Sequence, residues 1–387
     1  MVTRVIRHIG ELTTNDPSLG DFSVMGRLRD AALVMDEARV LWVGADAEAP
    51  EADEMIDARG SAVMPGMVDS HTHLVFAGER SGEFEARMAG QHYDGGGIRR
   101  TVRATRGAST EQLRSDAVAR LDELHTNGVT TVEIKSGYDL RVEGEARLVD
   151  LAAQLTSEVT FLGAHVVPEE FGNDREGYLN LVTGAMLDAT RDRARWIDVF
   201  CERGAFDVEE SRRVLLAGRD AGLGLRVHAN QLRDIGGVAL AVELDAASVD
   251  HCTYVSDDDL DALVSSSTVA TLLPGAEFFT RSPYPSARRL LDAGACVALA
   301  TDCNPGTSYV TNMSLVIALA VREMGMSVDE AIWAVTRGGA RALRRDDIGH
   351  LGVGAAADVL ILDAPRAAHL AYRPGSALIR QTLLATR

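Results

Sequence analysis

Eight apolar, β-branched segments alternate with helix-forming segments through the middle of this chain, and this alternation constrains the fold more than any other feature. Apolar strands joined by helical crossovers are typical of parallel strands covered by helices. Eight such units in roughly 240 residues match a (β/α)8, TIM-like barrel, with a doubly wound sheet as the alternative. The expected strands are Val63–His73, Val129–Ser136, Val159–Val167, Trp196–Glu202, Leu225–Asn230, Ser248–Cys252, Val269–Pro274 and Val297–Asn304.

The segments between these strands are rich in alanine, arginine, glutamate and leucine, which favour helices. Further helices are expected between Thr311 and Arg344. The crossover helices are expected at Thr110–Asn127, Glu143–Leu155, Glu176–Ala189, Val208–Ala221, Ile235–Glu243, Asp257–Ser265 and Ser286–Ala293.

Both ends of the chain predict short strands separated by turn residues. The N-terminal strands are Arg4–Ile9, Ala31–Met35 and Val40–Gly44, and a C-terminal strand is Ala357–Asp363. A closed barrel has no free edge, so the C-terminal strand cannot extend it. We therefore expect two domains: a small β-sandwich of residues 1–62 with 350–387, and an α/β barrel of residues 63–349.

The composition narrows the possible partners. A formal net charge of -18 argues against binding to nucleic acid or to anionic membranes. The chain has no apolar run long enough to span a membrane, and its N-terminus has no apolar core typical of a signal peptide. Cys201, Cys252, Cys296 and Cys303 are far apart in sequence, which fits a reducing compartment. We expect a cytoplasmic protein with a small-molecule substrate.

Histidines gather at the carboxyl ends of the expected strands. Taken alone, His71 and His73 could be two hydrogen-bonded side chains. However, His165, His228 and His251 also follow strands, and active sites of such barrels form at these ends. Side chains two residues apart in a strand point to the same side, so His71 and His73 are expected to face one site. A divalent cation would satisfy both imidazoles.

The expected metal ligands are His71, His73, His228 and Asp302, with water in an open position. Bound zinc lowers the pKa of such a water to about 7, which makes hydroxide available at neutral pH. Asp302 can also accept the water's proton, and His251 can orient the water or carry the proton to a leaving nitrogen. The alternatives are a helix-capping Asp302 and a hydrogen-bonded core His251.

Lys135, the only lysine, bears on the number of metal ions. Two-metal barrels of this type bridge their ions with a carboxylated lysine on the fourth strand. The fourth expected strand, WIDVFCER, has no lysine, and Lys135 lies on the second strand. We expect one metal ion per chain and a structural or supporting role for Lys135.

The H-x-H pair, the two later histidines and the aspartate after the eighth strand resemble the amidohydrolase superfamily. Longer runs, from about Met64 to Leu362, are similar to the imidazolonepropionase family. These runs include FAGERSGEFEARMAG, GGGIRRTVRATRGAS, VEIKSGYDL, TFLGAHVVP, IDVFCERGAF, HANQLRDIGG, TLLPGAEFF and ATDCNPGTS. The resemblance implies hydrolysis of 4-imidazolone-5-propanoate to N-formimidoyl-L-glutamate, the third step of histidine degradation, with one zinc or iron ion.

The resemblance also implies the substrate contacts. Arg80 would bind the propionate group, because a guanidinium fork matches a carboxylate. The ring would contact Tyr138, His165 and Gln231, and the carboxylate end of the product would contact Asn304, Gly306 and Thr307. Gln231 stands where many deaminases of the superfamily have glutamate. Because an amide cannot shuttle protons, the acid–base work is expected at Asp302 and His251.

The chain departs from the family between Met88 and Gly95, where the loop before Gly95–Gly97 is shortened. This loop could cover the site. Asp139 and Asn230 replace residues common in the family. The alternatives are a deaminase of a cyclic amidine or purine-like ring, which Gln231 disfavours, and a metal-free scaffold, which the full ligand set disfavours. The expected assembly is a homo-oligomer, a dimer.

Overall fold

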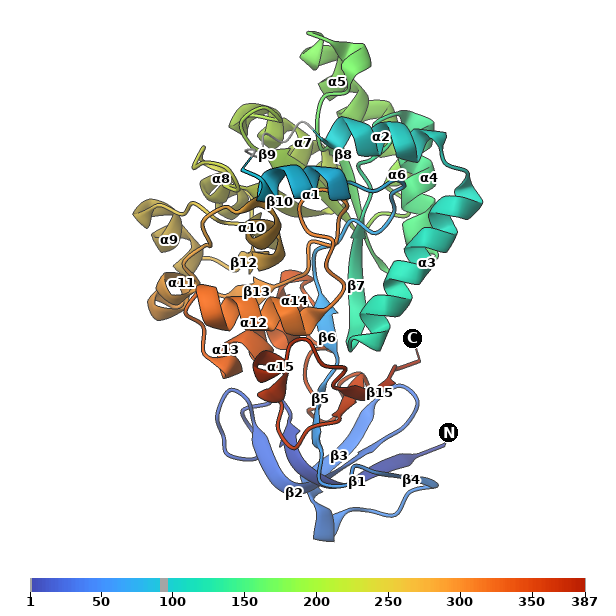
Figure 1. Ribbon diagram of the computed structural model, residues 1–387, viewed down its shortest axis with the longest axis vertical. Coiled ribbons are helices and arrows are strands. Elements are labelled where there is room, and N and C mark those ends of the chain that lie inside the picture. The colour runs from blue at the N-terminus through green and yellow to red at the C-terminus, as the bar shows by residue number, and fades with distance from the viewer. Residues whose placement is uncertain (1, 91–96, 387) are drawn as a thin grey trace. The chain divides into compact units, whose positions relative to one another are not determined.

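The computed structural model describes residues 2–90 and 97–386, which form two compact units (Figure 1). The first unit contains Met1–Asp69, Glu123–Thr131 and Asn312–Arg387, and the second contains Ser70–Asp122 and Val132–Thr311. The expected division into residues 1–62 with 350–387 and residues 63–349 stays a prediction. Residues 91–96 of the expected shortened loop and glycine run lie outside the described residues.

A mixed sheet of seven strands brings together both ends of the chain, blue and red in Figure 1. Its order is β15-β14-β5-β1-β2-β3, and β4 pairs with β1. Ile6, Leu33, Val359 and Ile361 belong to the apolar core that this sheet buries. The prediction that both chain ends form a small β domain is therefore confirmed. The strands are β1 (Arg4–Thr13), β2 (Arg27–Met35), β3 (Val40–Ala45), β4 (Glu54–Asp57), β5 (Ala62–Pro65), β14 (Val359–Leu362) and β15 (Ile379–Leu383).

The other eight strands lie side by side in chain order, from β6 to β13, as the predicted barrel requires. The pairs between β7 and β13 are parallel. A parallel bridge between Thr72 and Cys303 links the two ends of the series, with the His73 N–H donating to the Cys303 carbonyl at 3.0 Å. This link confirms the barrel and excludes the doubly wound alternative. The strands are β6 (Met67–Asp69), β7 (Val129–Lys135), β8 (Glu158–Ala164), β9 (Trp196–Cys201), β10 (Gly224–Ala229), β11 (Ser248–His251), β12 (Val269–Leu272) and β13 (Val297–Leu299).

The first expected strand, Val63–His73, is corrected by the structure. It is two strands, β5 and β6, which belong to different sheets. Gly66 separates them, and a Cβ atom there would lie 2.1 Å from Oγ1 of Thr130, so only glycine fits. His71 and His73 therefore follow a strand rather than end one.

The helices of the second unit cover the barrel strands. Helices α4, α7 and α8 pack on β8, β9 and β10 respectively (Figure 1). The expected helix Glu176–Ala189 is interrupted, because a π-helical turn at Val182–Met186 separates α5 from α6. Helices α1 and α2 were not expected from the sequence. The helices of this unit are α1 (Ser81–Met88), α2 (Ile98–Gly107), α3 (Thr110–Thr126), α4 (Val142–Ala153), α5 (Arg175–Leu181), α6 (Leu187–Thr190), α7 (Val208–Asp220), α8 (Gly237–Glu243), α9 (Asp257–Val264), α10 (Pro274–Thr280) and α11 (Ala287–Ala293).

Three of the remaining helices confirm the helical stretch expected between Thr311 and Arg344. They are α12 (Met313–Glu323), α13 (Val328–Trp333) and α14 (Gly339–Ala342). The short helix α15 (His369–Tyr372) lies beyond this stretch and was not expected. Within residues 2–90 and 97–386, none of the helices has the length and apolar character needed to cross a membrane.

Candidate active site

The four predicted metal ligands come together at the carboxyl ends of the barrel strands. Nε2 of His71 and Nε2 of His73 each lie 3.5 Å from Oδ1 of Asp302. Nε2 of His228, a residue of β10, lies 3.3 Å from Nε2 of His73. All four side chains are buried and belong to the second unit. Two histidines after β6, one histidine of β10 and one aspartate after β13 therefore converge on one point.

The spacing of these atoms fits a single divalent cation. Ligand atoms at 2.0–2.1 Å from a tetrahedral ion are about 3.3–3.4 Å from one another. The observed distances of 3.3–3.5 Å match this value. Nε2 of His71 is buried and has no hydrogen-bond partner among the described residues, as expected for an atom that binds a metal. The donor set fits zinc or iron.

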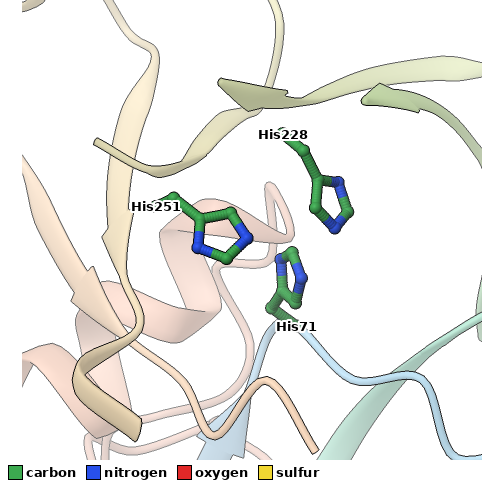
Figure 2. Close-up of side chains that lie close together, drawn as sticks. All are labelled: His71, His228 and His251. Carbon is green, nitrogen blue, oxygen red and sulfur yellow. The ribbon is translucent and has the colours of Figure 1, made fainter. Parts of the chain in front are cut away.

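His251 lies beside this cluster. Its ring centroid is 5.4 Å from that of His228 and 5.8 Å from that of His71. Figure 2 shows these three rings directed toward one another from three different segments of the chain. One nitrogen from each of them lies within 4.8 Å of the others, so they form a second candidate ligand group. His251 is therefore close enough to act on a group bound at the metal site.

Two buried carboxylates fix the ligand imidazoles from behind. Oδ2 of Asp250 lies 2.8 Å from Nδ1 of His71, and Oδ2 of Asp198 lies 2.9 Å from Nδ1 of His228. The Nδ1–H of His71 donates to Asp250, which leaves the Nε2 lone pair of His71 for a metal, and Asp198 lies at ion-pair distance from His228. Neither carboxylate was predicted as a site residue. The available signal was a lone acidic residue inside a buried apolar strand, as in WIDVF and SVDH.

Nearby cations keep these two carboxylates ionised. Burial by itself raises the pKa of Asp198, but the neighbouring His228 ring and the Lys135 ammonium hold that pKa well below its usual range. Burial likewise acts to raise the pKa of Asp250, and Arg226 and Lys135 outweigh it and lower that pKa. Asp302 differs, because burial, together with the charge of Glu277, raises its pKa well above the usual range despite the opposing effects of Asn304 and Lys135. A metal ion would supply the missing positive charge.

A pocket opens over three of the four candidate ligands, His73, His228 and Asp302. It contains every predicted substrate contact except Gly306, together with Ile98, Val166 and Phe200, which were not predicted. Its lining is His73, Arg80, Ile98, Tyr138, His165, Val166, Phe200, His228, Gln231, His251, Asp302, Asn304 and Thr307.

Arg80 is buried at the edge of this pocket and already has a partner. Its Nε and Nη2 donate to Oε2 of Glu83 at 2.9 and 2.6 Å. A Cβ atom on Gly306 would lie 2.3 Å from Nη1 of Arg80, and one on Gly97 would lie 2.0 Å from Nη2. These two glycines therefore make room for the guanidinium. The pairing with Glu83 was not predicted, although an i,i+3 spacing from an arginine is a recognisable signal.

The loop after Asp302 is held together by Asn304. Its Oδ1 accepts the N–H groups of Gly306 and Thr307, each at 2.8 Å, and its Nδ2 donates to Oγ1 of Thr307 at 2.9 Å. The Thr307 hydroxyl in turn lies 3.4 Å from Oδ2 of Asp302. Asn304, Gly306 and Thr307 thus form one hydrogen-bonded turn beside Asp302, a candidate metal ligand. Their predicted contact with the product stays a prediction.

Tyr138 and His165 form one wall of the pocket, with their ring centroids 5.3 Å apart. Nδ1 of His165 lies 3.0 Å from the Gly137 carbonyl, so the Nδ1–H donates there. Glu145, a buried residue that was not predicted, accepts the N–H groups of Gly137 and Asp139, each at 2.8 Å. Glu145 therefore fixes the turn that carries Tyr138. Gln231 follows β10, at the end of the sequence motif HANQ, and also lines the pocket.

Both His165 and His251 are neutral over the physiological pH range. Burial, followed by the effect of the neighbouring His228 ring, lowers the pKa of each ring to about 3. A neutral ring can accept a proton at one nitrogen and donate from the other.

We expect the imidazole NMR signals of His165 and His251 in the metal-free protein to stay constant between pH 8 and pH 5. In urea-unfolded protein the same rings should titrate near pH 6.5. Because these pKa values fall on folding, the two rings contribute stability above the unfolded-state pKa, and this contribution is lost as the pH falls below it. A midpoint between pH 6 and pH 7 for either ring in folded protein would contradict this expectation.

The comparisons with known proteins agree with this geometry. The amidohydrolase family matches residues 62–384. An imidazolonepropionase of Streptomyces griseus is 58% identical, over 98% of this chain and 97% of its own length. One of Mycolicibacterium smegmatis is also 58% identical, over 99% of this chain and 96% of its own length.

Solved structures agree in fold. Atrazine chlorohydrolase from Arthrobacter aurescens, complexed with zinc, has a TM-score of 0.73 at 19% identity and covers 99% of this chain and 94% of its own. N-isopropylammelide isopropylaminohydrolase from Burkholderia multivorans has the same score and identity, with 100% and 97% covered. At this identity the likeness concerns the fold alone. On the strength of the sequence relatives, the chain belongs to the imidazolonepropionase family of the amidohydrolases.

Proposed function

We infer that this protein hydrolyses 4-imidazolone-5-propanoate to N-formimidoyl-L-glutamate, the third step of histidine degradation. The observation that carries this inference is the 58% identity to imidazolonepropionases over nearly the whole of both chains. The geometry supports it, because the ligand set and most of the predicted substrate contacts surround one pocket. We propose that the enzyme works in the cytoplasm, a reducing compartment that fits four dispersed cysteines, and that it is a homodimer.

The reaction opens one carbon–nitrogen bond and forms one carbon–oxygen bond. The oxygen of water adds to the ring carbonyl carbon, and the ring nitrogen bonded to that carbon departs and takes up a proton. We propose that His71, His73, His228 and Asp302 hold one zinc or iron ion at this point. Such an ion supplies Lewis acidity at the carbonyl and lowers the pKa of water.

Asp302 and His251 are the proposed proton carriers. Asp302 is buried next to the ligand imidazoles, where its carboxylate can take a proton from the attacking water. His251 is neutral, and its ring lies within reach of the same point. It can therefore carry a proton to the departing ring nitrogen. Gln231 has no titratable group, so its proposed role is a hydrogen bond to the ring.

Arg80 is the proposed anchor of the propionate group. The protein is strongly acidic overall, so an anionic substrate needs a local cation. Two glycines hold the buried guanidinium closely, which favours one fixed orientation. We propose that Tyr138 and His165 contact the ring, and that the turn Asn304–Thr307 with Gly306 receives the new carboxylate.

The direct test is to incubate purified protein of known metal content with imidazolone propionate. We expect the ring absorbance to disappear and full activity to require about one equivalent of zinc or iron per chain. Release of ammonia from a cyclic amidine, without turnover of imidazolone propionate, would instead support the deaminase alternative. Two tightly bound equivalents of metal would contradict the single-ion site.

We expect Arg80→Ala to raise KM strongly while the metal content stays unchanged. Loss of one partner from a buried, charge-assisted pair typically costs about 2–5 kcal/mol. Arg212, a partly buried residue of α7 that pairs with Glu243, provides a matched control, because Arg212→Ala removes the same charge outside the pocket. Equal KM values for the two variants would assign Arg80 a structural role only.

Three variants separate the proposed roles in catalysis. We expect His251→Asn to keep most of its metal and to lose kcat by about 10²–10⁴-fold, the usual size of an acid–base contribution. Asp302→Asn should lower both metal content and kcat, because an amide is a weaker ligand and no base. Gln231→Ala should act mainly on KM.

The measurement for these variants is kcat and KM alongside metal content for each protein. Near wild-type kcat in His251→Asn, together with abolished activity in Gln231→Ala, would show that the roles are assigned to the wrong residues.

A further inference from the structure

The only lysine of the chain, Lys135, is fully buried beneath the candidate metal centre. All other fixed cationic side chains are arginines. Lys135 is the last residue of β7, and its ammonium points into the barrel toward three carboxylates. Nζ lies 2.9 Å from Oε1 of Glu133, 2.9 Å from Oδ2 of Asp198 and 3.8 Å from Oδ2 of Asp250.

Two of these three oxygens also hold ligand imidazoles. Oδ2 of Asp198 lies between the Lys135 ammonium and Nδ1 of His228. Oδ2 of Asp250 lies 2.8 Å from Nδ1 of His71. One ammonium therefore lies next to both carboxylates that orient ligands from different strands.

A second buried cation completes the cluster. Nη2 of Arg226 lies 3.2 Å from Oδ2 of Asp250 and donates to the Ser70 carbonyl at 2.7 Å. Glu133 is held in place as well, because it accepts the Thr160 hydroxyl and, at 3.2 Å, the Thr72 N–H. The positions of all three carboxylates are thus fixed by donors on neighbouring strands.

The charges of this cluster suit a divalent cation. Three carboxylates and two cations leave one negative charge, and Asp302 adds a second. A divalent ion would balance these two charges. Removing Lys135 would leave three buried carboxylates with one cation, and the carboxylates would repel one another. Asp198 would then lose the neighbour that holds its oxygen against His228.

The geometry also explains why this cation is a lysine. An ammonium is a compact charge with three donors that can diverge toward three acceptors, whereas a guanidinium is a planar fork suited to two parallel bonds. The contacts at 2.9 Å occupy Nζ on two sides in a fully buried space. The enclosed Nζ is therefore not free to be carboxylated, the modification that makes a lysine a bridging metal ligand.

We propose that Lys135 is a positioning residue for the metal: by holding Asp198 and Asp250, it fixes His228 and His71 with their Nε2 atoms directed at one divalent ion. This inference rests on the metal ligands of the proposed function, but it does not depend on which substrate is hydrolysed. Metal affinity therefore tests it independently of turnover.

The test measures zinc affinity by competition with a chelator at fixed pH. Lys135→Met keeps the length of the side chain and removes its charge, and we expect it to bind zinc about 10–100-fold more weakly. Asp198→Asn should cause a similar loss. Because part of the effect of Lys135 passes through Asp198, the double variant should lose less zinc affinity than the two single losses combined.

Glu158→Gln is the matched control, because Glu158 is a fully buried carboxylate of β8 that pairs with Arg195 and Trp196. Its zinc affinity should stay within about threefold of the wild type. An equal loss in this control would indicate general destabilisation and overturn the proposal. Zinc affinity of Lys135→Met within threefold of the wild type would also overturn it, as would additive losses in the double variant.

A measurement on the unaltered protein covers the case in which Lys135→Met does not fold. Because the chain has one lysine, protein labelled with 15N-lysine contains a single side-chain ammonium. We expect one equivalent of zinc to shift the signal of that ammonium. An unchanged signal at full zinc occupancy would overturn the proposal. Failure to hydrolyse imidazolone propionate, with these results intact, would count against the proposed function alone.

Discussion

This site depends on buried carboxylates that each contact both a histidine ring and a cationic side chain. A carboxylate in the barrel interior is unfavourable unless its charge is compensated and its lone pairs are occupied. Asp198 meets this condition through His228 and Lys135, and Asp250 through His71 and Arg226. The interior of such a barrel is often apolar. Here it contains paired charges, which we propose orient the metal ligands.

The backbone at the strand ends is the second constraint. His251 and Asp302 both have positive φ angles, of 80° and 52°, which are unfavourable for residues other than glycine. Such conformations persist only where surrounding contacts enforce them, and they cluster at functional sites. His251 is the last residue of β11, and Asp302 follows the end of β13. The backbone turns at these two positions, and each side chain lies at the candidate metal centre. Tight turns such as Asn304–Thr307 then hold these positions.

The sequence predicts the barrel and the convergence of His71, His73, His228 and Asp302, because both depend on local patterns. Apolar alternation marks the strands, and histidines mark their carboxyl ends. The strand ends were less predictable: the expected strand Val297–Asn304 stops at Leu299, where the chain leaves the sheet to form the site. The break at Gly66 and the pair Lys135–Asp198 depend on neighbours that only the folded chain brings together. A single acidic residue in a strand does not reveal which histidine it will meet.

The position of the lysine bears on the proposed single-ion site. A bridging lysine would have to come from the fourth strand, β9, whose inward-facing polar residue is Asp198. That carboxylate lies behind His228 rather than between two ions, and the only lysine lies two strands away with its ammonium enclosed by carboxylates. The charge that a second ion would provide is therefore already present as an ammonium. Because this ammonium is fixed to the protein, it can neutralise the carboxylates without binding substrate or water.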